Sequence, residues 1–130
     1  MIKAKYYVYL LKSTVSNKTY IGYSIDPCQR LKKHNGLLSG GAKKTQKGRP
    51  WELVLYITGF EYERTALQYE FCIQRTKKYK RTTGVRNKMY IMKSLLTKQD
   101  KICSTAPLTS EMRLVIFFMS REYRLLWESL

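Results

Sequence analysis

The sequence predicts an α+β fold: a small central, mainly antiparallel sheet of three strands, with an added C-terminal strand as a candidate, flanked by helices. Two observations support this prediction. Short segments rich in aromatic and β-branched residues are separated by polar turns, which is typical of antiparallel strands. Longer segments carry hydrophobic residues at helical spacing. With 130 residues and 44% hydrophobic content, a globular chain with a real core is expected.

The first two strands are predicted to form a hairpin. Residues 6–11 alternate between the two faces of an extended chain, and residues 19–23 have the same strand-like composition. Residues 13–18 between them are polar and predict a turn. The alternation places Tyr7 and Tyr9 on the same face of the first strand.

A helix is predicted to follow the hairpin. Asp26 can cap free N–H groups and Pro27 suits the first helical turn, so the helix begins there and runs to about Gly36. Arg30 and His34 lie one helical turn apart and share a face, so a guanidinium and an imidazole can both reach one phosphate group. His34 is the only histidine in the chain.

The middle of the chain supplies a third strand and a second helix. Residues 51–58 have strand composition, and residues 62–78 show hydrophobic residues at helical spacing. Glu70 lies within this helix. A glutamate in a helix is usually a solvated residue, but apolar neighbours at helical spacing predict partial burial here. A half-buried lone carboxylate requires a nearby cation.

Residues 86–130 are predicted to be an extension packed on a core formed by residues 1–85. The extension is predicted to contain a short helix, a linker, an added edge strand and a terminal helix, over residues 88–96, 98–107, 112–119 and 120–130. The strand is favoured by a β-rich composition, and one long helix is the alternative.

The charge balance indicates the class of partner. The chain has 25 Lys and Arg against 9 Asp and Glu, a net charge of +16. Such an excess costs self-repulsion unless a polyanion is present, so nucleic acid is the expected partner. An anionic membrane surface is the alternative, but the basic residues are spread over strands, loops and helices instead of one amphipathic helix.

The sequence also indicates a compartment. No apolar run approaches the ~20 residues of a membrane span, and the apolar run at residues 6–11 is too short for the hydrophobic region of a secretory signal, so none is expected. The three cysteines are widely separated and form no CxxC pair, which suits reduced thiols. An intracellular protein of the nucleus or cytoplasm, not secreted and not bound to a membrane, is expected.

Two basic segments are candidate contacts for a nucleic-acid backbone. Residues 37–49 are rich in glycine and lysine and predict a mobile loop, and residues 75–88 form a basic run that includes Tyr79, a residue able to stack on a base. Either segment can also be a solvated surface. The candidate residues are Lys43, Lys44, Lys47, Arg49, Arg75, Lys77, Lys78, Lys80 and Arg81.

One ordered series of motifs resembles a known family. Its members are Tyr7-Val8-Tyr9, Tyr20-Ile21-Gly22, Arg30, His34 and Glu70. Together they resemble the GIY-YIG nuclease superfamily, although Tyr7 stands where the motif's name has glycine. Within this superfamily, the chain is similar to the catalytic subunit of the eukaryotic structure-specific endonuclease that cuts branched DNA. This closer similarity rests on motifs at residues 34–36, 40–42, 49–55, 59–60 and 66–71.

The resemblance implies a metal-dependent, structure-selective endonuclease that hydrolyses phosphodiester bonds near branch points, such as flaps and Holliday junctions, in DNA repair or recombination. Branched double-stranded DNA would be the partner. Glu70 would hold one Mg²⁺ or Mn²⁺, and Arg30 would contact the scissile phosphate with His34 beside it. The alternative is a catalytically inactive basic module that binds DNA or RNA.

The resemblance further implies that Tyr9 or Tyr20 helps to activate the attacking water, and it leaves open which of them is the base. A phenol is a poor base unless nearby cations lower its pKa, which Arg30 and the metal ion could do.

The sequence departs from this branch of the family after the nuclease-like region. The eukaryotic subunit has a cysteine- and histidine-rich zinc domain that docks a scaffold partner, whereas here only Cys103 follows Cys72. The zinc domain is therefore expected to be absent, a scaffold partner is not implied, and a homodimer is left open.

Overall fold

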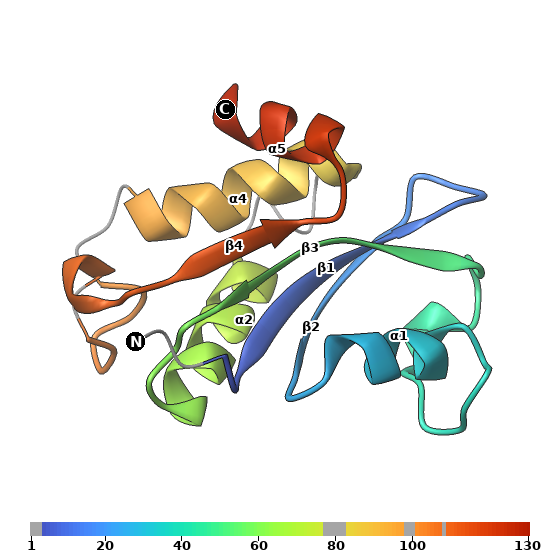
Figure 1. Ribbon diagram of the computed structural model, residues 1–130, viewed down its shortest axis with the longest axis horizontal. Coiled ribbons are helices and arrows are strands. Elements are labelled where there is room, and N and C mark those ends of the chain that lie inside the picture. Colours follow the sequence, from blue (N-terminus) through green and yellow to red (C-terminus); the bar gives the residue numbers. More distant parts are fainter. Residues whose placement is uncertain (1–3, 77–82, 98–100, 108) are drawn as a thin grey trace.

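The computed structural model describes residues 4–76, 83–97, 101–107 and 109–130 (Figure 1). A four-stranded sheet of order β2-β1-β3-β4 lies at its centre, and every neighbouring pair is antiparallel. Its strands are β1 (Tyr7–Ser13), β2 (Thr19–Ser24), β3 (Trp51–Thr58) and β4 (Val115–Phe118). The helices are α1 (Pro27–His34), α2 (Glu63–Arg75), α4 (Val85–Thr97) and α5 (Arg121–Glu128). Two 3₁₀ turns, η1 (Lys43–Thr45) and η2 (Thr109–Glu111), lie in the connections.

The predicted α+β class is confirmed, including the added C-terminal strand. The alternative of one long C-terminal helix is wrong. The chain leaves β4 and starts a new helix at Ser120, whose hydroxyl accepts a hydrogen bond from the Tyr123 backbone N–H at 3.3 Å and so caps α5. Helix α4 starts at Val85, earlier than the predicted residue 88. The helix starts within the basic run over residues 75–88, whose composition did not indicate a helix.

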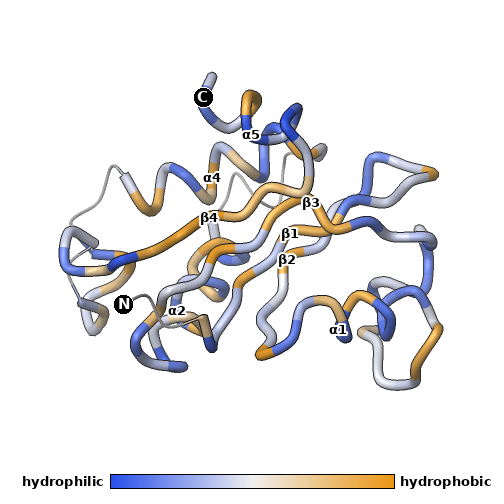
Figure 2. Tube along the Cα trace, in the orientation of Figure 1, coloured by the Kyte–Doolittle hydropathy of each residue, from blue (hydrophilic) through white to orange (hydrophobic). Residues whose placement is uncertain are grey.

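Alternation along the hairpin strands produces two separate hydrophobic clusters on the two faces of the sheet. Val8, Leu10 and Ile21 face the larger cluster, to which α2, α4 and α5 contribute. Tyr9 and Leu11 face the smaller cluster, which also includes residues from the start of β3 and from α1. Figure 2 shows the hydrophobic segments running along the strands, including β4.

A β-bulge in β3 changes which of the two clusters its residues face. Leu10 pairs with Leu55, but Leu11 pairs with Leu53, so Val54 is an extra residue on the β3 side. As a result, Val54 and Leu55 both belong to the larger cluster, while Leu53 belongs to the smaller one.

The two helices beside the hairpin lie on either side of the edge strand β2. Helix α1 contacts β3 and β2, and α2 contacts β2 and β1 (Figure 1). The Gln74 side-chain amide donates a hydrogen bond to the Ile21 carbonyl at 3.0 Å, which ties α2 to β2. This edge therefore brings residues from both helices next to the hairpin.

The C-terminal residues close the larger cluster. Strand β4 pairs with β3, and Trp127 of α5 lies edge-on against Phe118 with ring centroids 5.8 Å apart. Lys93 of α4 donates hydrogen bonds from Nζ to the carbonyls of Trp127 and Leu130, both at 3.0 Å. Within the described residues, none of the helices has the length and apolar character needed to cross a membrane.

Candidate active site

The centre of the candidate site is a contact between β1 and α1. The Tyr9 hydroxyl lies 2.7 Å from His34 Nε2, and both side chains are buried, with exposed fractions of 1% and 0%. Tyr9 pairs across the hairpin with Gly22. A Cβ atom on residue 22 would overlap the Tyr9 hydroxyl, so glycine is required here to make room for that group.

Thr45 in η1 fixes the proton positions in this contact. Its hydroxyl lies 2.7 Å from the Ala42 carbonyl, which can only accept, so the single hydroxyl proton is used there. The same oxygen lies 2.9 Å from His34 Nδ1 and must therefore accept a hydrogen bond from the Nδ1–H group. Nδ1 thus carries the imidazole proton, and Nε2 is left as the acceptor for the Tyr9 hydroxyl.

The environment of this chain of hydrogen bonds sets its acidity. Burial lowers the His34 pKa to about 4, and Arg30 and Arg49 act in the same direction. Burial raises the pKa of Tyr9, followed by the influence of Tyr20, while Arg30 opposes the rise. Arg30 lowers the pKa of Tyr9, as expected from the sequence, but burial raises this pKa by more. Tyr9 is therefore protonated in the free protein.

The structure corrects the predicted place of His34. The sequence analysis placed the imidazole next to a phosphate together with Arg30, because both lie on one face of α1. In the structure the ring is fully buried and both nitrogens are hydrogen bonded inside the protein. The imidazole is therefore enclosed by protein, and its Nε2 faces the Tyr9 hydroxyl instead of solvent.

Arg30 and Glu70 approach this centre from the two helices. Arg30 is partly exposed, and its Nη1 donates to the Gly40 carbonyl at 2.8 Å, which anchors the guanidinium. Glu70 of α2 is half-buried, and burial raises the pKa of its carboxyl while Arg30 opposes that rise. Among the described residues, the Glu70 carboxylate has no hydrogen bond and no ion pair.

Tyr20 completes the group of predicted site residues. Its ring centroid lies 4.8 Å from that of His34 and 6.4 Å from that of Tyr9. Burial raises the pKa of Tyr20, and the Glu70 charge adds to this effect. The structure therefore brings Tyr9, Tyr20, Arg30, His34 and Glu70 into one group at the β2 edge.

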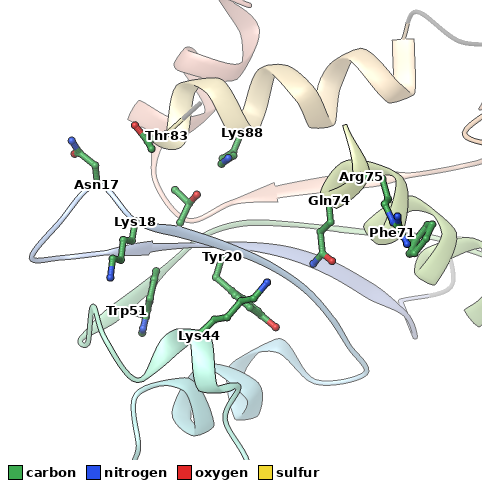
Figure 3. A pocket seen from close by; sticks show the side chains of 11 residues that line it. Asn17, Lys18, Tyr20, Lys44, Trp51, Phe71, Gln74, Arg75, Thr83 and Lys88 are labelled. Atoms are coloured by element: carbon green, nitrogen blue, oxygen red, sulfur yellow. The ribbon is translucent and has the colours of Figure 1, made fainter. Parts of the chain in front are cut away.

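A basic cleft of about 580 Å³ opens beside Tyr20 (Figure 3). Lys44 and Arg75, which come from the two separate basic segments of the sequence, both line it, together with Phe71. Among the described residues that line the cleft, four are basic and none is acidic. Two of these, Lys18 and Lys88, were not among the predicted nucleic-acid contacts, although Lys88 lies within the basic run.

The other predicted nucleic-acid contacts have different surroundings. Lys43 and Lys47 are exposed near η1, outside the cleft lining. Arg49 donates a hydrogen bond from Nε to the His34 carbonyl at 2.7 Å, so it also holds α1 in place. The remaining candidates, Lys77, Lys78, Lys80 and Arg81, lie outside the described residues.

The loop over residues 37–49 is more closely packed than its composition indicated. It was expected to be a mobile loop because it is rich in glycine and lysine and contains few apolar residues. Thr45 at its centre is fully buried, and its carbonyl accepts a hydrogen bond from Trp51 Nε1 at 2.8 Å. The polar side of this loop is therefore part of the site.

The chain is similar to known proteins over the region that contains this site. The model of the GIY-YIG catalytic domain matches residues 5–83. The chain belongs to the GIY-YIG family. The matched range includes every residue of the group at the β2 edge, so the resemblance inferred from the ordered motifs is confirmed.

The similar curated proteins of this family are structure-specific endonuclease subunits. The chain is 37% identical over 100 residues to the SLX1 homolog of Cryptosporidium parvum, covering 77% of this chain and 24% of that protein. It is 50% identical over 76 residues to slx1 of Aspergillus terreus, covering 56% and 20%. The corresponding values for the SLX1 homolog of Leishmania major are 48% over 71 residues, 52% and 10%. The chain thus spans about a quarter or less of the length of these relatives.

Proposed function

We propose that this GIY-YIG protein is a metal-dependent endonuclease that hydrolyses phosphodiester bonds near branch points in DNA, such as flaps and Holliday junctions. The observation that carries the proposal is the hydrogen-bonded chain Tyr9–His34–Thr45 next to a basic cleft and to the Glu70 carboxylate, which has no partner among the described residues. A binding module has no need for a buried proton acceptor or for a carboxylate facing a polyanion. A role in DNA repair or recombination, in the nucleus or cytoplasm, accords with this activity.

The proton of the attacking water is taken by Tyr9 in this proposal. Because Tyr9 is protonated in the free protein, it accepts that proton only as its own proton passes to His34 Nε2. Tyr20 has no such acceptor among the described contacts, but it lines the open cleft. Its greater access to solvent makes Tyr20 the second candidate for the base.

Arg30 supplies the positive charge for the phosphate. Its guanidinium is anchored at Gly40 and lies close enough to Tyr9 and Glu70 to interact with both electrostatically. A planar guanidinium can hold two phosphate oxygens at once, which favours charge build-up in the transition state.

Glu70 suits a hard divalent cation such as Mg²⁺ or Mn²⁺. Its half-buried carboxylate lacks a hydrogen-bond partner among the described residues, and loss of hydration raises its pKa, so a cation would stabilise the ionised form. Such ions bind through as little as one protein carboxylate, with water and phosphate oxygens completing the shell. When bound, the ion would neutralise phosphate charge and stabilise the leaving oxygen.

The test is the substitution Glu70→Gln, which keeps size and helix propensity but removes the charge that the cation needs. Mg²⁺-dependent cleavage of labelled flap and junction DNA should be lost, while affinity in a gel shift is retained or slightly raised. Folding stability at neutral pH should not fall, because burial disfavours the ionised carboxyl in the folded state.

Glu61→Gln is the matched control, since Glu61 is exposed and lies in the connection between β3 and α2. Cleavage by Glu70→Gln at the parent rate would remove Glu70 from the site. Equal cutting of linear and branched DNA by the parent would refute structure selectivity. Absence of cutting by the parent, with tight binding, would establish the inactive binding module instead.

A further inference from the structure

Phe71 is an exposed aromatic residue directly after the proposed metal-binding residue. Helix α2 buries Ala66, Tyr69 and Ile73 on its inner face, but the Phe71 side chain is 55% exposed. Leaving a phenylalanine in water forgoes the stabilisation that burial gives to its neighbours on the same helix. Phe71 lines the basic cleft instead, on the α2 wall that also carries Arg75 (Figure 3).

Arg75 holds the Phe71 ring in a defined position. The Arg75 guanidinium carbon lies 4.7 Å from the ring centroid, and the two residues are one helical turn apart. One face of the ring is thus in contact with a cation while the side chain stays half exposed. A flat apolar surface flanked by positive charge matches the chemistry of a nucleotide, which has a flat base and an anionic phosphate.

We propose that Phe71 stacks on an unpaired base at the branch point, while Lys44 and Arg75 contact the phosphates on either side of that base. This inference rests on the proposed function, because it names the feature of branched DNA that the site recognises. Bases inside a duplex are covered by their neighbours, so only an unpaired or terminal base offers a free face. Stacking on an aromatic ring tolerates any base, so the contact selects structure and not sequence.

The charge of the cleft favours a nucleic acid over a protein segment as the occupant. Leu67 lies one turn before Phe71 and is 42% exposed, so an apolar stripe on α2 could also dock a protein. The cleft lining, however, has four basic residues and no acidic one among the described residues, and it adjoins Tyr20 of the site. Leu67 does not line this cleft and serves as the matched control.

The experiment uses the full chain and a flap substrate with 2-aminopurine at the first unpaired position, in buffer without divalent ions. Stacking on a ring quenches this base, so the parent and Phe71→Trp should reduce its fluorescence on binding, whereas Phe71→Ala should not. Loss of one base stack should weaken binding of the flap by about tenfold for Phe71→Ala. Binding of blunt linear duplex should stay the same, and Leu67→Ala should match the parent in every arm.

Three results would overturn the proposal. The first is that Phe71→Ala binds the flap and quenches 2-aminopurine as the parent does, and the second is that Phe71→Ala loses affinity equally for the flap and for linear duplex. The third is that Leu67→Ala loses as much affinity for the flap as Phe71→Ala, which would show a general apolar docking face. Because binding is measured without metal, failure of the parent to cut DNA would refute the proposed function without altering this measurement. If the parent cuts DNA normally and Phe71→Ala binds the flap as the parent does, base stacking is refuted while the proposed function stands.

Discussion

Replacing Thr45 with valine tests whether His34 is the proton acceptor for Tyr9. Valine has nearly the shape of threonine but lacks the hydroxyl that accepts from His34 Nδ1 and donates to the Ala42 carbonyl. The side chain at this position is fully buried, so the imidazole N–H would lose its partner at a position that bulk solvent does not reach. An unsatisfied buried donor costs about 1–3 kcal/mol.

The same substitution removes the constraint on the imidazole tautomer. A proton on Nε2 would face the Tyr9 hydroxyl and close the path by which Tyr9 passes on its proton. General acid–base catalysis contributes about 10²–10⁴-fold to rate, so single-turnover cleavage of a flap by Thr45→Val should fall by at least about 100-fold. The protein should stay folded, because domains of this size have about 5–15 kcal/mol of stability.

Thr45→Ser provides the control, because it keeps the hydroxyl and loses only a methyl group. It should cleave within a few-fold of the parent, with a stability loss of about 1 kcal/mol measured by urea unfolding. The relay through His34 would be refuted if Thr45→Val is folded, binds DNA normally and cuts it at the same rate as Thr45→Ser.

Two further predictions concern the same group of residues. Tyr9→Phe should lower single-turnover cleavage by about 100-fold or more with little change in affinity, and Tyr20→Phe should lower it less; the reverse order would make Tyr20 the base. His34 should make stability depend on pH, because its pKa is about 4 in the folded protein against 6.5 ordinarily, so the unfolded chain binds more protons between these values. Its contribution is complete above pH 6.5 and falls by about 3 kcal/mol as the pH drops to 4. Urea unfolding at several pH values should show this loss in the parent but not in His34→Gln, and parallel profiles would contradict it.

The fold was largely predictable because its signals are local. Alternation over residues 6–11 set the two faces of β1, and the same face assignment holds in the two hydrophobic clusters. The edge strand near residue 116 was favoured by its β-rich composition, but the sequence left one long helix as the alternative. The bulge at Val54 was not, because it depends on how β3 fits two clusters at once.

The proximity of the five candidate residues was predictable, whereas their surroundings were not, and their catalytic roles stay a prediction. The order of motifs selected the five residues that the structure brings together. Sequence could not show that His34 is buried, because one lone histidine on a helix face looks the same whether it meets solvent or a tyrosine. The sequence did not indicate a role for Thr45 either, because burial cannot be inferred from its local surroundings. It lies in a polar loop, and its burial results from long-range contacts with His34 and Trp51.

The acidities of Tyr9 and His34 indicate when the proposed relay can operate. In the free protein both oppose proton transfer, since the pKa of Tyr9 is raised and that of His34 is lowered. Passing a proton through Tyr9 leaves a positive charge on His34, next to Arg30 and Arg49, which disfavour it. A phosphate bound at Arg30 offsets that repulsion, and the added negative charge of the transition state offsets it further. In the proposed relay, negative charge at the phosphate therefore favours the positive charge that forms on His34. The proposal thus places the contact of Arg30 with the phosphate before the action of Tyr9 on water.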